Sequence, residues 1–180
     1  FLFLFMCAIS VSSTWKMLVK TTPTSTWTSY SFNDNSWDDY NGNDYVYKEG
    51  TVYVRQKFTG LSNMAAYELT FYQQYGLIIY INGNEGYRNN MPEGSVTANT
   101  PCNGHYEFLY HHSVIRNGLE IEGDECVVAM EYHYEDNTSS HTFRIGGFLS
   151  PYAADVGEDC YQSYETFSVT SSSSKEESDD

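Results

Sequence analysis

The sequence predicts an all-β protein built as a single antiparallel β-sandwich. Apolar and polar residues alternate in several short runs, an Asn-Gly pair separates two strand-like runs, and no long stretch shows the apolar period of a helix. Aromatic residues make up 17% of the 180 residues, and tyrosine accounts for 17 positions. Because aromatic side chains suit the half-buried surface of a pleated sheet, the composition agrees with the pattern.

Two segments precede the predicted sandwich. Residues 1–13 are apolar and end in small residues, which is typical of a secretory signal peptide; with no Met or basic segment before them, we expect the signal to be truncated at its start. Residues 14–24 hold a short strand-like run, 14–19, followed by a polar linker. A signal peptide implies a secreted or cell-surface protein.

The sandwich itself is expected over residues 25–151. Residues 77–81 are uninterruptedly apolar, as in a strand buried on both faces, and the Asn82-Gly83 pair that follows predicts a tight hairpin. The other expected strands are 51–58, 67–72, 126–134 and 142–149, the last two forming a hairpin. The acidic, Ser-rich residues 152–180 have no core pattern and are expected to be a tail or linker.

The charge of the chain excludes two classes of partner. Asp and Glu number 24 against nine Lys and Arg, which gives a formal charge of −15. Such a surface repels phosphate backbones and anionic lipid, so we expect no nucleic-acid partner and no direct membrane binding. The acidic group Asp34, Asp38, Asp39 and Asp44 could hold Ca²⁺, but it lacks the spacing of a calcium loop, and no cofactor is expected.

The cysteines and one sequon predict covalent modifications. Outside the signal segment stand Cys102, Cys126 and Cys160, without the spacing of a zinc site. We expect a Cys102–Cys126 disulfide, with Cys102–Cys160 as the alternative. Asn137 lies in an Asn-Thr-Ser sequon between two expected strands and is predicted to be glycosylated.

Five short motifs occur in order along the chain. They are Asp-Asn-Ser-Trp at 34–37, Tyr-x-Arg-x-x-Phe at 53–58, the strand and turn 76–83, Arg-x-Asn-Met-Pro-x-Gly at 88–94, and the strand 127–133 ending in Glu-x-His. Together they resemble the galactose-binding-like, jelly-roll modules of secreted and cell-surface proteins. The chain departs from that family at Gln74-Tyr75-Gly76, where acidic residues are usual. The resemblance implies a module that is usually not catalytic.

Candidate ligand-binding residues follow from the resemblance and from the aromatic surplus. Glu131 and His133 share one face of their strand. Exposed loop aromatics beside hydrogen-bonding groups would form a glycan platform. The candidates are Trp37, Tyr87, Arg88, Asn90, Glu131 and His133, with Tyr40, Tyr45 and Tyr47 as further loop aromatics. The aromatics expected to fill the sandwich core are Tyr53, Phe58, Tyr67, Phe71, Tyr80 and Phe143.

The function expected from the sequence is a non-catalytic module that binds glycans or a cell-surface protein. A structural accessory domain without a small ligand is the alternative. No spacing pairs two carboxylates as a glycosidase requires, and no nucleophile or metalloprotease motif occurs, so we expect no enzyme activity. In the expected hairpin His141 faces away from Glu131 and His133, so no metal site is predicted.

Overall fold

The computed structural model describes residues 14–19, 21–43, 45–47, 50–59, 66–108, 110–117, 125–135, 141–145 and 149–152. These residues form the strands β1 (Trp15–Val19), β2 (Asp38–Tyr40), β3 (Tyr45–Tyr47), β4 (Val52–Phe58), β5 (Ala66–Gln73), β6 (Gly76–Ile81), β7 (Asn84–Asn89), β8 (Tyr110–Asn117), β9 (Cys126–His133), β10 (His141–Phe143) and β11 (Leu149–Tyr152). The described part contains no helix that is long and apolar enough to cross a bilayer.

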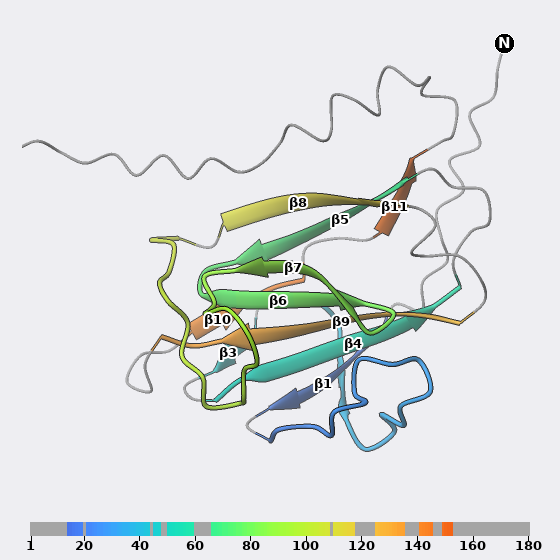
Figure 1. The fold of residues 1–180 in the computed structure, drawn as a ribbon, viewed down its shortest axis with the longest axis horizontal. Helices are drawn as coiled ribbons and strands as arrows, with labels where there is room; N and C mark the ends of the chain where they lie inside the picture. Colours follow the sequence, from blue (N-terminus) through green and yellow to red (C-terminus); the bar gives the residue numbers. More distant parts are fainter. Residues whose placement is uncertain are drawn as a thin grey trace, which may run out of the picture.

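The strands form two layers, and every pairing is antiparallel (Figure 1). One layer is a six-stranded sheet in the order β2-β1-β4-β9-β6-β7. The other combines a three-stranded sheet, β11-β5-β8, with the pair β10-β3. A bridge between Tyr72 and Arg144, whose backbone N···O distance is 3.2 Å, connects these two smaller sheets. The predicted all-β antiparallel sandwich is confirmed.

The main core lies between the two layers. It contains the inward-facing residues Trp15, Met17, Tyr40, Val52, Val54, Phe58, Phe71, Leu77, Ile79, Ile81, Cys126, Val128, Met130, Tyr132, Tyr134, Phe143 and Ile145. The alternation is the one expected for β4, in which Val52 and Val54 face this core while Tyr53 joins a different cluster. β6 and β9 are buried along nearly their whole length, so both faces of the six-stranded sheet are covered.

The hairpin β6–β7 forms at the predicted Asn-Gly pair. Asn82 has φ 49° and Gly83 has φ 85°, the left-handed backbone that a two-residue hairpin turn requires. The pairing register then shifts between Ile79 and Tyr80, so that Gly86 is the extra residue of a β-bulge. This bulge changes which side chains of β7 share a face.

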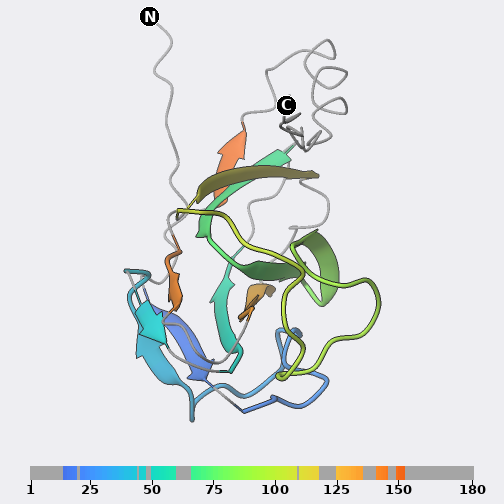
Figure 2. The ribbon, with the colours of Figure 1, turned by 90° about the vertical axis from the view of Figure 1, so that its left-hand side faces the viewer.

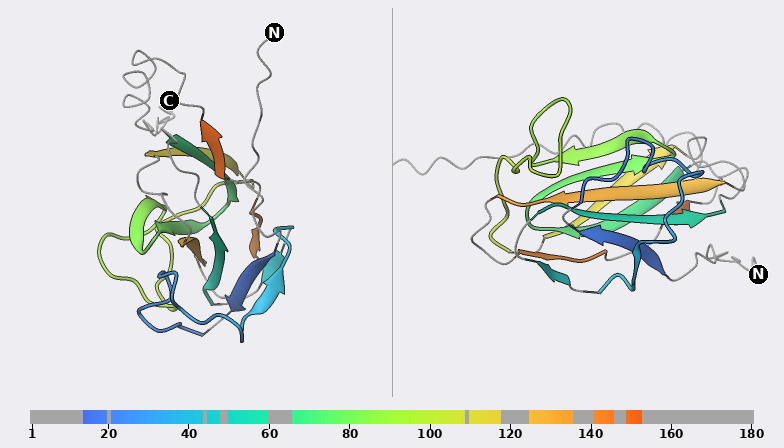
Figure 3. Two further views of the ribbon diagram at one scale, coloured as in Figure 1. Left: turned by 90° about the vertical axis from the view of Figure 1, so that its right-hand side faces the viewer. Right: turned by 90° about the horizontal axis from the view of Figure 1, so that it is seen from below.

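Two long loops cover the outer face of the six-stranded sheet, the face turned away from the main core. Residues 21–37 and 90–108 lie on the same side of β4 in two opposite views (Figures 2 and 3). Beneath them lie Tyr53 and Ala129, packed with Trp27, Trp37 and Ala98 from the loops. We call residues 21–37 the first loop and residues 90–108 the second loop.

Arg55 of β4 anchors the first loop. Its side chain is fully buried and forms an ion pair with Asp34, and its Nη2 donates to the carbonyl oxygen of Ser29 at 2.8 Å. The guanidinium also lies 5.2 Å from the centre of the Phe32 ring. Because a buried charge needs a compensating charge and hydrogen bonds, this ion pair holds the loop against the sheet.

Backbone and side-chain hydrogen bonds anchor the second loop. The N–H of Cys102 donates to the carbonyl of Tyr134 at 2.8 Å, and the N–H of Tyr106 donates to the carbonyl of Gln74 at 2.7 Å. Thr51 Oγ1 donates to the carbonyl of Ala98 at 2.8 Å. The loop is thereby held in its middle and toward its C-terminal end.

The predicted Cys102–Cys126 disulfide is wrong. Both residues are buried thiols, in separate clusters. Cys126 begins β9, whereas Cys102 bonds to Tyr134, just beyond the other end of that eight-residue strand. At about 3.3 Å per residue, the strand holds the two cysteines about 25 Å apart. Cys160 lies outside the described residues.

Three other expectations about the strands need correction. β9 and β10 do not pair with each other, because β9 lies between β4 and β6 while β10 pairs with β3. β8 lies where no strand was expected, and it pairs with β5 along its whole length. β1 forms at the expected strand-like run, but it belongs to the six-stranded sheet, between β2 and β4, and does not precede the sandwich.

We predict that Gly76→Ala destabilises the fold by about 2 kcal/mol, the cost of overpacking a closely packed site. A Cβ at Gly76 would lie 2.3 Å from Met91 Sδ and 2.6 Å from Cys102 Cβ. Gly104→Ala is the matched control, since nothing lies within 4 Å of its Cβ position. Urea unfolding measures both variants, and equal stabilities would contradict the prediction.

We also predict that Asp34→Ala lowers the free energy of unfolding by about 3–5 kcal/mol, because it leaves the buried Arg55 guanidinium without its counter-charge. Asp39→Ala is the control: it removes an exposed ion pair with Lys16, 2.6 Å long, whose contribution is small because water screens it. Urea unfolding measures the stability of both variants. A similarly small loss of stability in each would refute the anchoring role of Arg55.

Candidate ligand-binding cavity

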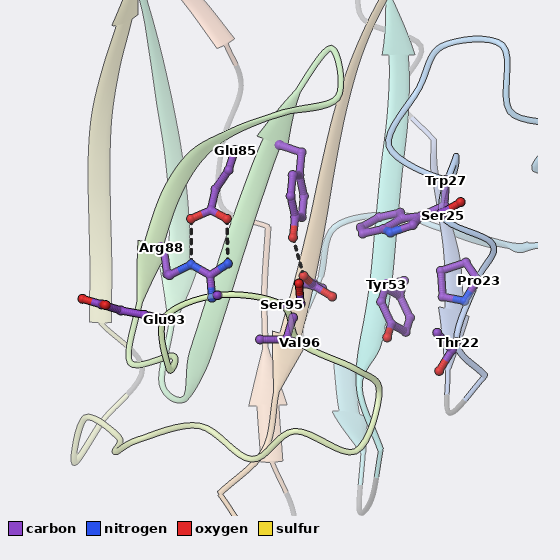
Figure 4. Close-up of a pocket in the computed structure, with 13 residues that line it drawn as sticks. Thr22, Pro23, Ser25, Trp27, Tyr53, Glu85, Arg88, Glu93, Ser95 and Val96 are labelled. Atoms are coloured by element: carbon purple, nitrogen blue, oxygen red, sulfur yellow. Dashed lines mark hydrogen bonds and ion pairs between the residues drawn. The ribbon is translucent and has the colours of Figure 1, made fainter.

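A cavity of about 880 Å³ lies on the outer face of the six-stranded sheet, between the first and second loops. Its lining comes from both loops, from β7 and from the sheet floor: Thr22, Pro23, Ser25, Trp27, Tyr53, Tyr80, Glu85, Arg88, Glu93, Gly94, Ser95, Val96 and Glu131. In Figure 4 the residues of the first loop stand on one side and Glu85, Arg88 and Glu93 on the other. The volume falls in the range of small-ligand sites.

Three aromatic rings form one side of the cavity. Trp27 meets Tyr53 at a centroid distance of 5.1 Å and Tyr80 at 5.7 Å, in both cases edge to face. Trp37 stacks on Trp27 from behind, 6.2 Å away. Such contacts between rings hold Trp27 in one orientation, so the cavity has a preformed apolar wall.

Glu131 of β9 supplies a carboxylate at the floor. Its residue is only 4% exposed, and Tyr80 donates its phenolic hydrogen to Oε1 at 2.6 Å. Burial raises the pKa of Tyr80, and the hydrogen bond to Glu131 raises it further. Tyr80 therefore keeps its proton at neutral pH and remains a donor to the carboxylate.

His133 lies behind Glu131, on the same face of β9. It is fully buried, and its Nδ1 lies 2.8 Å from the carbonyl oxygen of Thr100 and 3.1 Å from Thr51 Oγ1. A carbonyl oxygen can only accept, so Nδ1 carries a hydrogen. Nε2 then points to Glu131 Oε2 at 3.4 Å. His133 connects the cavity floor to the second loop and does not line the cavity.

Glu85 and Arg88 of β7 form the opposite wall. The guanidinium donates twice to the carboxylate, from Nε and Nη2, each at 2.6 Å, and Nη1 donates to the carbonyl of Pro92 at 2.6 Å. These hydrogen bonds lower the pKa of Glu85 and raise that of Arg88. Both groups are therefore charged at neutral pH, and each offsets the other.

Only some of the ligand-binding residues predicted from the sequence line the cavity. Arg88 and Glu131 line the cavity, and His133 and Trp37 lie one layer behind it. Tyr87 faces the main core, where its ring lies 5.1 Å from that of Phe71.

Asn90 also lies outside the cavity lining. Its φ is 53°, and its carbonyl accepts from the N–H of Asn103 at 2.7 Å. It therefore shapes the start of the second loop. The loop aromatics Tyr40 and Tyr45 pack on Phe143 in the core, and the side chain of Tyr47 lies outside the described residues.

Of the lining residues, the sequence predicted only Arg88 and Glu131, and it misplaced or missed the others. Tyr53 and Tyr80 were expected to fill the sandwich core, but they lie on the outer face, under the loops. Trp27 and Glu85 were not proposed at all. Period-2 alternation correctly placed Tyr53 and Val52 on opposite faces of β4. The sequence did not reveal that loops also cover the outer face, where Tyr53 lies.

Two acidic residues of the first loop and β2 have individual basic partners. Asp34 binds Arg55, and Asp39 binds Lys16. Asp44 lies outside the described residues. Within the described ranges, no three His, Cys, Asp or Glu side chains gather into a group that could hold a metal ion.

The arrangement suits binding by an apolar surface together with hydrogen bonds. The aromatic wall offers a flat apolar contact, and Glu131 keeps accepting capacity beyond its bond with Tyr80. Thr22, Ser25 and Ser95 add hydroxyl groups around the rim. A ligand with one apolar face and several hydroxyl groups matches this combination.

No protein-family model and no curated protein matches the sequence. Among solved structures, a β-glucuronidase of Faecalibacterium prausnitzii is similar with a TM-score of 0.44 and 9% identity, over 70% of this chain and 20% of that one. A calcium-binding mutant of β-glucuronidase 2 from Bacteroides uniformis is similar with a TM-score of 0.44 and 14% identity. That similarity covers 80% of this chain and 17% of the other. This chain thus spans a fifth or less of those chains, and a similarity this weak carries no functional argument.

We predict that Glu85→Gln destabilises the protein in a pH-dependent way. Because the pKa of Glu85 is lowered in the folded state, its ion pair contributes stability above the ordinary pKa of glutamate, and that contribution is lost as pH falls through the lowered value. The pair is partly exposed, so the loss at neutral pH should be below about 1 kcal/mol. Urea unfolding at neutral pH and near about pH 3 measures it. An equal loss at both would contradict the prediction.

Proposed function

We propose that this chain is a non-catalytic β-sandwich module of the galactose-binding-like type that binds a carbohydrate in the cavity between its two loops. One observation carries the proposal. The cavity combines a fixed aromatic wall, headed by Trp27, with a buried carboxylate, Glu131, on its floor. Sugars present an apolar face of C–H groups and a rim of hydroxyls, and both would find partners here.

The state of the carboxylates supports a binding role without catalysis. Hydrolysis of a glycosidic bond requires two carboxyl groups that act as acid and as base or nucleophile. Both oxygens of Glu85 accept hydrogen bonds from Arg88, and Glu131 accepts one from Tyr80. Groups held in this way are suited to orienting a ligand more than to transferring protons.

A structural accessory domain without a small ligand is the second candidate. It is favoured by the burial of the aromatic wall, since Trp27 is 8% exposed and Tyr53 is 2% exposed. Little ring surface is then available for stacking, and the rings also support the first loop. The two candidates differ in whether any saccharide binds the cavity.

The extracellular or cell-surface location and the glycosylation of Asn137 stay predictions. The signal segment and residues 153–180 of the tail lie outside the described residues, as does Asn137. The extracellular or cell-surface location rests on the sequence of residues 1–13 alone.

Blocking the cavity tests the function. A glycan array identifies saccharides that bind, and Ser95→Trp should then abolish their binding, because the new indole would occupy the space between the loops. Ser95 is exposed on the second loop, so the larger side chain need not disturb the core. Ser36→Trp, at an exposed position outside the cavity lining, is the matched control.

Binding is measured by titration of tryptophan fluorescence, since Trp27 lines the cavity. We expect saturable quenching or enhancement in the wild type and in Ser36→Trp, and none in Ser95→Trp. Absence of any saccharide ligand at high protein concentration would favour the structural candidate. Binding that survives Ser95→Trp would place the ligand elsewhere on the molecule.

A further inference from the structure

The cavity carries negative charge on its floor and on one side. Three carboxylates line it, Glu85 of β7, Glu93 of the second loop and Glu131 of β9. Among the described residues that line the cavity, Arg88 is the single basic side chain. These four groups leave the lining with a formal charge of −2.

The positive charge of Arg88 is already offset. Its Nε and Nη2 donate to both oxygens of Glu85, and its Nη1 donates to the carbonyl of Pro92. This bidentate geometry matches the way a guanidinium recognises a carboxylate. A carboxylate on a ligand would therefore have to displace Glu85 to gain the same contact.

Glu131 is the most buried of the charged residues that line the cavity. Its residue is 4% exposed, so a charged group placed near it is only weakly screened by water. His133 Nε2 lies 3.4 Å from Glu131 Oε2. Glu93 is exposed at the rim and adds a negative charge that Arg88 does not offset, because Arg88 is paired with Glu85.

From these groups we infer that the cavity selects sugars by charge: it prefers a sugar with a free, protonated amine to the neutral sugar and rejects uronic acids. This inference rests on the proposed carbohydrate-binding function and names its ligand class. The ammonium group would donate to Glu131 or Glu93 and lie near the aromatic wall, whose ring faces attract cations. A uronate would face carboxylates and would lose hydration without gaining a counter-charge. The chain's formal charge of −15 acts in the same direction.

Matched oligosaccharides test the selectivity. The probes are tetrasaccharides of β-1,4-linked glucosamine, glucose and glucuronic acid, with the corresponding galactose and mannose forms on an array. Relative to the neutral form, each charged form changes one group per sugar: an amine replaces the hydroxyl at C2, or a carboxylate replaces the hydroxymethyl group. We expect the amine form to bind about tenfold more tightly than the hydroxyl form, as when a charge-assisted hydrogen bond replaces a neutral one, and the uronate form not to bind. Higher salt should reduce the preference.

Substitutions of the lining carboxylates test which residues cause the preference for the amine form. Glu93→Gln should lower the ratio of amine to hydroxyl affinity about threefold, as expected for a partly screened charge, and Glu131→Gln should lower it further. Glu107→Gln, at an exposed position outside the lining, is the control and should leave the ratio unchanged. Thermal unfolding checks that Glu131→Gln remains folded, and Glu93→Gln gives an independent answer because its side chain is exposed.

The outcomes separate the two levels of the proposal. If no probe of any charge binds, both the carbohydrate-binding function and the charge selectivity fall. If sugars bind but the uronate form binds as well as the amine form, the function stands and the selectivity is wrong. An amine preference that neither Glu93→Gln nor Glu131→Gln reduces would also overturn the inference, since it would arise outside the cavity.

Discussion

The buried ion pair between Arg55 and Asp34 is the constraint on which the outer face of this protein depends. Arg55 points away from the main core, toward a face that would otherwise meet water. A fully buried guanidinium is stable only when a counter-charge and hydrogen-bond acceptors are brought to it, and the first loop supplies both through Asp34 and the carbonyl of Ser29. The same loop carries Trp27, which thereby reaches Tyr53 and Tyr80 and completes the wall of the cavity.

The second loop depends on the neighbouring strand in a comparable way. His133 of β9 bonds to the carbonyl of Thr100, while the backbone N–H of Cys102 bonds just beyond the end of that strand. Glu131, two residues earlier on the same face, is left to line the cavity. One strand therefore holds a loop with one side chain and presents a ligand-binding carboxylate with another. Residues that anchor the loops and residues that line the cavity alternate along a single surface.

Local sequence patterns predicted the fold class and individual strands well. They did not predict which strands, distant in the sequence, pair with each other. The Asn82-Gly83 hairpin and the doubly buried β6 followed from turn chemistry and an apolar run. The β9–β10 hairpin failed because proximity in sequence suggested a partner, whereas β9 pairs with β4 and β6. The disulfide failed for a related reason. Nothing in the spacing of Cys102 and Cys126 reveals that the full length of β9 lies between them.

The sequence by itself determined the fold class, the acidic character and the shared face of Glu131 and His133, because strand periodicity and charge are local properties of the chain. The tertiary structure alone decided which residues line the cavity. The bulge at Gly86 shifts the register of β7, so that Arg88 joins Glu85 on the outer face while Tyr87 turns to the core. Strict alternation would have separated Glu85 from Arg88. A side chain's face depends on the pairing register with its neighbour, and that register is a property of two strands together.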